Sequence, residues 1–157
     1  MAIDSKLRSS DLIQIKVRDI SSGSLIQSRA IIEQMKTHRA VQFEITSKTQ
    51  QYLNLWIHDQ RLTPSNDLFP SPRRHSHHIS YHYYSGIVKQ WVNNLGLDLT
   101  QYNTHSLRRT KASLIYAKTK NLRAIQLLLG HPKLESTIEY LGAEIEDALT
   151  ISEATET

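Results

Sequence analysis

The sequence of 157 residues contains no cysteine. This absence excludes disulfide bonds, a thiol nucleophile and cysteine-ligated zinc. No apolar run approaches the roughly 18 residues that a membrane-spanning helix needs, and the N-terminal MAIDSKLRSS lacks the apolar core of a secretory signal. The chain is long enough for one ordinary domain with a hydrophobic core and too short for two. We therefore expect a cytoplasmic protein of one domain.

Basic residues are missing from the C-terminal end and are in excess elsewhere. The chain has 19 Lys and Arg against 15 Asp and Glu, and residues 141–157 contain five of the acidic residues and no basic one. The rest of the chain therefore has 19 basic against 10 acidic residues. Such a basic body favours a polyanionic partner, most simply nucleic acid, although many soluble domains carry a similar excess.

Hydrophobic periodicity predicts a small antiparallel sheet in the first third of the chain. A short helix running into an extended piece is expected within residues 9–20. Residues 24–46 then contain two apolar segments separated by a tight turn. In the second segment Val41, Phe43 and Ile45 alternate with polar residues, which is typical of a strand with one buried face.

Helices are predicted for most of the remainder. Ser47 and Gln50 have the spacing of a capping box at a helix start, and residues 61–79 form a loop rich in Pro, Ser, Arg and His. Ser80 begins a helix that Gly96 closes. The predicted apolar stripe of that helix is Tyr84, Val88, Trp91, Val92 and Leu95. Further helices are expected at about 104–118, 122–129 and 134–141. This order of elements, without an internal repeat, predicts an α+β fold.

Two polar patterns in the helical part could carry chemistry. His105 and Arg108 are three positions apart at a predicted helix start, so their side chains are separated by only about 60° around the helix and can reach one site. The first turn of a helix also directs backbone N–H groups towards an anion. An isolated pattern of this kind is nevertheless most often an exposed polar helix start.

The segment LLLGHPKLESTIEYL, residues 127–141, places His131 at a helix break and Tyr140 near the end of the next helix. Packing explains these positions when they are taken singly. Gly130 suits the residue that follows a helix, Pro132 cannot extend one, and the histidine could cap free carbonyls. Helix ends also often bury a tyrosine.

The combination of positions is more informative than its parts. The chain presents, in order, an Arg in LRSSDL, a Lys at the tip of the predicted hairpin, the His-x-x-Arg pattern, a His at the break and a Tyr nine residues later. These residues are Arg8, Lys36, His105, Arg108, His131 and Tyr140.

This set resembles the tyrosine recombinase (phage integrase) family. The segment HSLRRTKASLIYAKTKNLRAIQLLLGHPKLESTIEYL is similar to the most diagnostic region of that family almost throughout. LRSSDL resembles the family's earlier Arg-x-x-Glu/Asp-Leu box, with Asp11 at the acidic position. Ser5 and Lys6 stand where the family often has a small residue and a glycine.

The chemistry of phosphodiester cleavage explains these residue types. The phosphate under attack becomes a pentacoordinate dianion. Arginine stays protonated, because its free pKa is about 12.5 or more, and its planar fork fits two oxygens. Two arginines and two histidines can therefore replace a metal ion. Tyrosine, with a free pKa of about 10, needs a base or nearby cations to become a nucleophile, and a lysine can protonate the leaving oxygen.

The resemblance implies a role for each residue. Tyr140 would attack the scissile phosphate, form a 3′-phosphotyrosyl link and release a 5′-hydroxyl. Lys36 would be the general acid towards the 5′-oxygen, and His105 would assist proton transfer at the tyrosine. The residues that would stabilise the transferring phosphate are Arg8, Arg108 and His131. The phosphotyrosine conserves the bond energy, so the reaction implied needs no ATP, no metal and no other cofactor.

The loop PRRHSHHISYHYY, residues 72–84, has two interpretations. Its histidines could ligate a metal, but clustered histidines in an Arg-rich loop without acidic residues are more often solvated or directed at phosphates. We favour contact with DNA. The histidines that could alternatively bind a metal are His75, His77, His78 and His82. The residues predicted to contact DNA, here and on the helix after His105, are Arg73, Arg74, His77, Arg109 and Lys111.

The resemblance also implies the organisation and the partners. Residues 1–141 would form the catalytic domain, a small antiparallel sheet packed against a mainly α-helical body, without its first helices and without the N-terminal core-binding domain of the family. Residues 142–157 would be an acidic C-terminal tail. The implied partner is double-stranded DNA. Self-association is expected because apolar surface would be left uncovered; the full-length family forms a tetramer on DNA, with the tail exchanged between protomers. A bacterial or phage origin is implied.

Two alternatives to a site-specific recombinase or integrase stay open at this point. The same chemistry without partner exchange would be a type IB topoisomerase-like relaxation of DNA. A truncated, non-catalytic DNA-binding remnant would bind DNA in a salt-sensitive way and form no covalent adduct.

Overall fold

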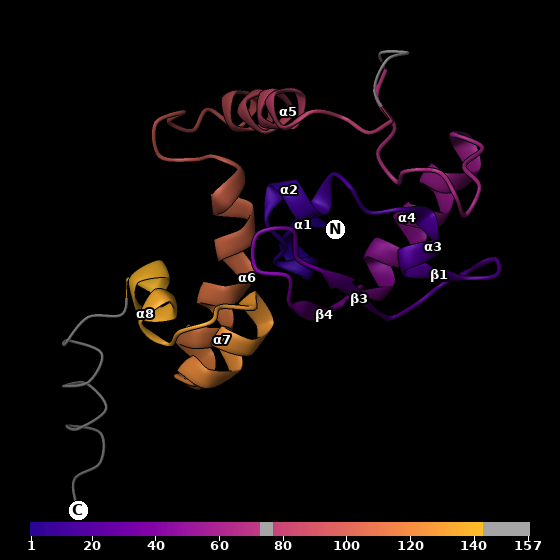
Figure 1. Cartoon of the computed structure of the whole chain (residues 1–157). Coiled ribbons are helices and arrows are strands. Elements are labelled where there is room, and N and C mark those ends of the chain that lie inside the picture. The colour runs from indigo at the N-terminus through magenta and orange to yellow at the C-terminus, as the bar shows by residue number, and fades with distance from the viewer. Residues whose placement is uncertain (73–76, 143–157) are drawn as a thin grey trace, which may run out of the picture.

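The computed structural model describes residues 1–72 and 77–142. Three short helices lead into two hairpins, and longer helices follow (Figure 1). The first elements are α1 (Ala2–Ser5), α2 (Ser9–Leu12), α3 (Val17–Ile20), β1 (Ser21–Ser22), β2 (Leu25–Ile26), β3 (Arg29–Glu33) and β4 (Ala40–Glu44). The later elements are α4 (Ser47–Asp59), α5 (Tyr81–Asn94), α6 (Thr104–Thr119), α7 (Leu122–Leu129) and α8 (Glu135–Leu141). In Figure 1, α6 descends from α5 to the pair α7 and α8, beside the N-terminal segments.

The predicted hairpin is confirmed as β3 and β4. The strands pair antiparallel, with Ala30 opposite Phe43 and Ile32 opposite Val41. Val41 and Phe43 are buried while their neighbours along β4 are exposed, which is the alternation that the sequence predicts. An isolated two-stranded ribbon is at best marginally stable in water, so this hairpin depends on its buried face. The second ribbon, β1 with β2, was not predicted from the sequence.

The helix caps explain where the longer helices begin. Ser80 caps α5 as predicted, because its hydroxyl accepts a hydrogen bond from the backbone N–H of Tyr83 at 3.1 Å. The predicted capping box at Ser47 and Gln50 is wrong by one residue. Thr46 is the N-cap of α4, and its hydroxyl accepts from the N–H of Thr49. Gln50 instead donates its side-chain amide to the carbonyl of Ile45 at 2.8 Å, so it cannot serve the box.

The apolar stripe of α5 is confirmed in part. Tyr84, Val88 and Val92 are buried, whereas Trp91 is 51% and Leu95 is 73% exposed. Trp91 lines an apolar pocket of about 290 Å³ together with Met1 and other side chains. Periodicity identifies the apolar face of a helix but not how far along that face another element covers it. Trp91 and Leu95 therefore continue the predicted apolar stripe but are exposed.

Two hydrophobic clusters of unequal size hold the fold together. The large cluster joins α2, α3, the β3–β4 hairpin, α4 and α5, and its most deeply buried side chains are Ile20, Phe43, Ile45 and Leu68. The small cluster joins α6, α7 and α8 around Ala112, Ile125 and Leu129. The α+β fold class is thus confirmed. Among the described residues, no helix is both long and apolar enough to cross a membrane.

Candidate active site

Arg8 is placed by a sharp change of backbone direction between α1 and α2. Lys6, directly after α1, has a left-handed backbone with φ of 55°, the conformation that glycine adopts most easily. The side chain of Lys6 is nevertheless buried, its ammonium donates to the carbonyl of Asp4 at 2.6 Å, and burial lowers its pKa to about 8. Arg8 then occupies the N-cap position of α2 in an extended conformation.

Arg108 lies in the second turn of α6 and is only 3% exposed. Asn103 caps this helix, since its side-chain oxygen accepts from the N–H of His105 at 2.8 Å. Nη2 of Arg108 donates to the carbonyl oxygen of Leu129 at 2.9 Å. Its Nη1 is buried and has no hydrogen-bond partner among the described residues. One donor of this guanidinium is therefore committed to the fold and another faces the site.

His131 follows the left-handed Gly130, which ends α7 with φ of 65°. Nδ1 of His131 lies 3.1 Å from the hydroxyl of Thr137 at the start of α8. Burial, and then the neighbouring Arg108 and Arg8, lower the pKa of the ring to about 4. His131 is therefore neutral at pH 7, and a neutral imidazole still has one N–H to donate.

Tyr140 is surrounded by these groups. Its ring packs edge-to-face on His131, with ring centroids 5.4 Å apart and an interplanar angle of 83°. Cζ of Arg108 lies 5.8 Å and Cζ of Arg109 lies 5.9 Å from the centroid of the tyrosine ring. The hydroxyl is buried without a hydrogen bond of normal geometry in the described part of the chain. A buried hydroxyl without a hydrogen bond is costly, and a catalytic role is one physical reason for a fold to retain such a group.

Opposing influences act on the ionisation of Tyr140. Burial raises the pKa of its phenol, while Arg108, Arg109 and Arg8 act in the opposite direction. Tyr140 also favours the charged form of Arg108, whose pKa is lowered chiefly by burial. The resting tyrosine is therefore protonated, and the cations beside it are placed to favour the phenolate once a proton acceptor is present.

The structure brings together four of the six residues that the sequence predicts for catalysis, Arg8, Arg108, His131 and Tyr140. Lys36 is exposed in the turn between β3 and β4, and His105 is exposed in the first turn of α6. Within the described residues, neither side chain makes a hydrogen bond or an ion pair. Both are therefore free to meet a substrate, and their catalytic roles stay predictions.

The residues predicted to contact DNA are distributed differently. Arg73 and Arg74 lie outside the described residues. His77 and Arg109 are exposed, and Arg109 also lies over Tyr140. Nζ of Lys111 is 3.0 Å from Glu44 and 3.6 Å from Asp4, so this cation already joins α6 to β4 and α1. Its contact with DNA stays a prediction.

A metal site in the histidine-rich loop is not tested, because His75 lies outside the described residues. Among the residues that are described, no three His, Cys, Asp or Glu side chains are grouped to hold a metal ion.

One residue of the site was missed by the sequence analysis. Gln34, directly after β3, is fully buried and accepts a hydrogen bond from Nη1 of Arg8 at 2.5 Å. A signal was present in the sequence. Ala30, Ile32 and Gln34 alternate, so the glutamine continues the inward-facing positions of the strand. A polar residue at such a position requires buried partners.

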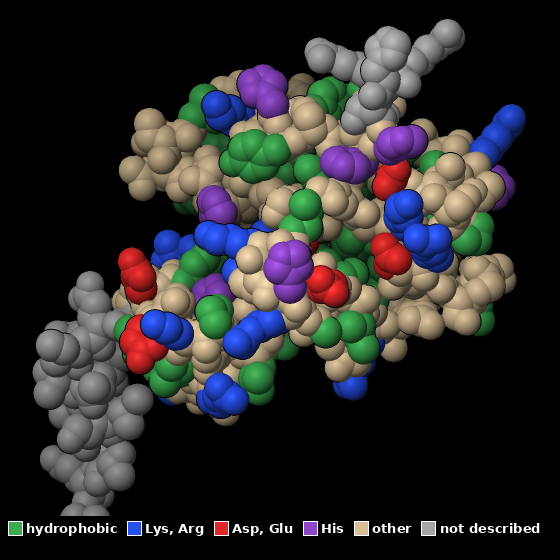
Figure 2. All heavy atoms as spheres, in the orientation of Figure 1, with side chains coloured by type: hydrophobic (Ala, Val, Ile, Leu, Met, Phe, Trp, Pro, Cys, Tyr) green, Lys and Arg blue, Asp and Glu red, His purple; other side chains and the backbone are tan. Residues whose placement is uncertain are grey.

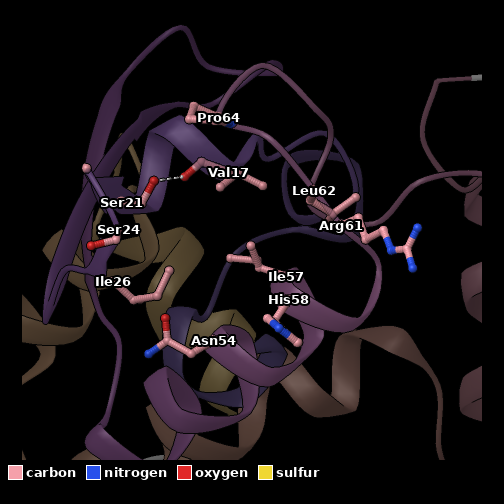
Figure 3. A pocket seen from close by; sticks show the side chains of 11 residues that line it. Val17, Ser21, Ser24, Ile26, Asn54, Ile57, His58, Arg61, Leu62 and Pro64 are labelled. Atoms are coloured by element: carbon pink, nitrogen blue, oxygen red, sulfur yellow. Dashed lines mark hydrogen bonds between the residues drawn. The ribbon is translucent and has the colours of Figure 1, made fainter.

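On the face shown in Figure 2, Lys, Arg and His side chains gather along the hollow between α5 and the part formed by α6, α7 and α8. A pocket of about 730 Å³ lies elsewhere, between α3, the β1–β2 turn and the end of α4 (Figure 3). It contains none of the predicted site residues. An open basic surface suits a polymeric anion better than a small molecule.

Comparison with known proteins agrees with this geometry. A sequence model described as the phage integrase family matches residues 1–146. The chain is 26% identical over 151 residues to tyrosine recombinase XerH of Helicobacter pylori, with 94% of this chain and 41% of XerH covered. It is 25% identical over 142 residues to the probable integrase/recombinase YoeC of Bacillus subtilis, with 90% of this chain and 74% of YoeC covered. The chain therefore spans less than half the length of XerH.

Solved structures share the fold. XerA recombinase aligns with a TM-score of 0.77 at 18% identity, over 99% of this chain and 56% of XerA. XerH in a post-cleavage complex with a palindromic difH substrate aligns with a TM-score of 0.71 at 26% identity, over 96% of this chain and 43% of XerH. Since the family's sequence model covers nearly the whole sequence and the fold is shared with its members, this chain belongs to the phage integrase family of tyrosine recombinases.

Proposed function

We propose that this chain is the DNA-cleaving and rejoining part of a site-specific tyrosine recombinase. The observation that carries the proposal is the hydroxyl of Tyr140, which lies buried beside two arginines and a neutral histidine and makes no hydrogen bond of normal geometry with the described residues. The N–H groups of Arg108 and His131 beside this phenol are suitable donors to a phosphate. XerH, which has been captured bound to its difH substrate before and after cleavage, supports DNA as the substrate.

In the proposed reaction the phenolate oxygen of Tyr140 attacks phosphorus, and the bond from phosphorus to the 5′-oxygen breaks. The phenol proton leaves to a base, for which His105 at the start of α6 is the candidate. The departing 5′-oxygen takes a proton from Lys36, at the end of the hairpin. Arg8, Arg108 and the N–H of neutral His131 stabilise the charge on the non-bridging oxygens. Attack of a 5′-hydroxyl on the phosphotyrosine reverses these steps and rejoins a strand.

The proposal includes the organisation of the chain. Residues 1–141 act as the catalytic domain, which the match of the family over residues 1–146 supports. Double-stranded DNA is the partner, and copies of the protein associate on it. The uncovered apolar pocket beside Trp91 supports such association, because exposed apolar surface favours contact between protein molecules. The acidic tail, proposed to pass between protomers, lies outside the described residues except for Gly142.

Covalent capture tests the proposal. A pool of duplexes with randomised sequence around a nick is incubated with the protein, so that cleavage near the nick releases a short piece and traps the phosphotyrosine. Wild-type protein is expected to give an adduct that survives detergent, and sequencing of the trapped DNA identifies the preferred site. Tyr140→Phe should give none, while Tyr52→Phe, which changes an exposed tyrosine of α4, should match wild type. No adduct from wild-type protein on any duplex would refute the proposed function.

A further inference from the structure

Gln34 connects parts of the molecule that the proposed function requires to act on one phosphate. It lies between the end of β3 and the turn that carries Lys36, and its side chain is fully buried. Its backbone closes the turn, since its N–H donates to the carbonyl of Arg39 at 2.9 Å and its carbonyl accepts from the N–H of His38 at 2.8 Å. Closing a turn needs no buried amide side chain, so the side chain has another task.

The side-chain oxygen of Gln34 holds Arg8. It accepts from Nη1 of Arg8 at 2.5 Å and from the hydroxyl of Thr37 at 2.9 Å. The first bond spans 26 positions in the sequence and ties α2 to the hairpin. A guanidinium held through one nitrogen still presents its other N–H groups, in a direction that the first bond determines.

The side-chain nitrogen of Gln34 reaches the other half of the site. It donates to the carbonyl of Leu129 at 3.2 Å, across 95 positions in the sequence. The same carbonyl accepts from Nη2 of Arg108 at 2.9 Å. A continuous hydrogen-bonded chain therefore runs from Arg8 through Gln34 and the carbonyl of Leu129 to Arg108.

The glycine after Leu129 makes this approach possible. A Cβ at Gly130 would lie 2.9 Å from the side-chain oxygen of Gln34 and 2.5 Å from a methyl carbon of Val41. The backbone that leads into His131 therefore packs directly on the glutamine. One amide thus contacts the segments that position Arg8, Lys36, Arg108 and His131.

We propose that Gln34 is a positioning residue that sets Arg8 in register with Arg108, so that both guanidinium groups meet the same phosphate. This inference rests on the proposed function and adds a residue to it. Gln34 does not touch the reacting atoms, and it acts through Arg8. Its removal should therefore misplace one positive charge and leave the nucleophile intact.

The first experiment measures single-turnover adduct formation on a nicked duplex recovered by the capture described above. Gln34→Leu keeps a similar volume and removes the three side-chain hydrogen bonds, and it should slow the reaction about 100-fold, the cost typical of a catalytic group displaced by about 1 Å. Gln34→Glu keeps an oxygen for Arg8 but loses the donor to the carbonyl of Leu129, so it should recover only part of the rate. Gln42→Leu, on the exposed face of the same hairpin, should react like wild type.

A second substrate separates positioning from a loss of structure. In a methylphosphonate, a methyl group replaces one non-bridging oxygen, so the reacting group has lost the negative charge that Arg8 would neutralise. The rate difference between wild type and Gln34→Leu should then shrink to less than about 10-fold, because a misplaced cation matters less when the charge is absent. An equal loss on both substrates, or a wild-type rate for Gln34→Leu on the phosphate, would overturn the inference.

A measurement without DNA keeps the inference testable if no adduct forms. In NMR spectra selective for guanidinium groups, Arg8 should give slowly exchanging signals that disappear in Gln34→Leu. The signals of Arg108 should persist, since its bond to Leu129 is independent of the glutamine. Unchanged Arg8 signals would show that Gln34 does not hold this arginine. Absence of adduct from wild type together with the expected NMR result would refute the proposed function alone.

Discussion

The N-terminal region, residues 1–96, and the C-terminal region, residues 104–142, are held together very differently. The first has the large hydrophobic cluster, into which one face of the β3–β4 hairpin and one face of α5 pack. The second has the small cluster around Ala112, Ile125 and Leu129, and Tyr140 is itself only a partly buried member. The proposed nucleophile, Tyr140, thus lies in the region with the small hydrophobic cluster. Arg8 and the hairpin that carries Lys36 lie in the region with the large one.

This difference shows that the site depends on the contacts between the two regions. Leu107 of α6 packs on the large cluster, Lys111 bridges to Glu44 and Asp4, and Gln34 bonds to the carbonyl of Leu129. A region with few buried apolar side chains opens locally at a low cost in free energy, so α8, which carries Tyr140, can shift more easily than the N-terminal region. The contacts across the boundary then decide whether the arginines and the tyrosine meet.

Gly130→Ala, at the boundary between the two regions, is expected to lower the free energy of unfolding more than the other changes considered below. A left-handed backbone costs an L-residue about 1–2 kcal/mol, and the added methyl would meet Val41 and Gln34 at 2.5 and 2.9 Å. Overpacking adds about 1–3 kcal/mol, so we expect the free energy of unfolding in urea to fall by about 2–5 kcal/mol.

Gly96→Ala is the matched control for this change. Gly96 has a φ of 67°, and nothing lies within 4 Å of an added Cβ. Only the backbone cost of about 1–2 kcal/mol should be seen. If both variants lost the same free energy of unfolding, Gly130 would not be in close contact with Val41 and Gln34 of the N-terminal region.

Lowering the pH is expected to reduce the free energy of unfolding by a moderate amount, through His131 in the C-terminal region. The ring of His131 has a pKa of about 4 in the folded protein against 6.5 for the free side chain. Between these values the unfolded chain binds more protons, so stability falls as the pH is lowered from about 6.5 towards 4. Because the ring is only partly buried, we expect a loss of about 1–2 kcal/mol, less than the full shift would give.

The difference between wild type and His131→Gln in urea unfolding at pH 7 and at pH 4.5 measures this contribution. The variant should lose less stability than wild type on acidification. A parallel loss in both proteins would show that His131 is not shielded by burial or by Arg108 and Arg8.

The smallest effect is expected from the ion pairs of Lys111. The side chain of Glu44 is 54% exposed, and exposed pairs contribute only about 0–1 kcal/mol. Glu44→Gln, which removes only the more exposed of the two pairs, should therefore lower the free energy of unfolding by less than about 1 kcal/mol. A double-mutant cycle of Glu44→Gln with Lys111→Met at low and high salt measures the coupling, and a coupling insensitive to salt would contradict this assignment.

Several elements were predictable because their signals are local. Ser80 and Gly96 bound α5, and the alternation at Val41 and Phe43 predicts β4 without knowledge of the rest of the chain. The sequence-based predictions failed where the position of a side chain depends on contacts with other segments. Trp91 has the spacing of a core residue, yet it lines an open apolar pocket. Thr46, rather than Ser47, caps α4, since its hydroxyl accepts from the N–H of Thr49, while Gln50 turns to the carbonyl of Ile45.

The sequence by itself determined the kinds of residue and their order, from Arg8 to Tyr140, because periodicity, caps and residue chemistry are properties of short segments. The resemblance already implied that Arg8 and Arg108, 100 positions apart, act on one phosphate, but how they are connected was decided only by the tertiary structure. It alone decided that Lys111 faces carboxylates and that a buried Gln34 lies between the arginines. Such pairings depend on the packing of distant segments, and no local pattern encodes which buried polar groups will face one another.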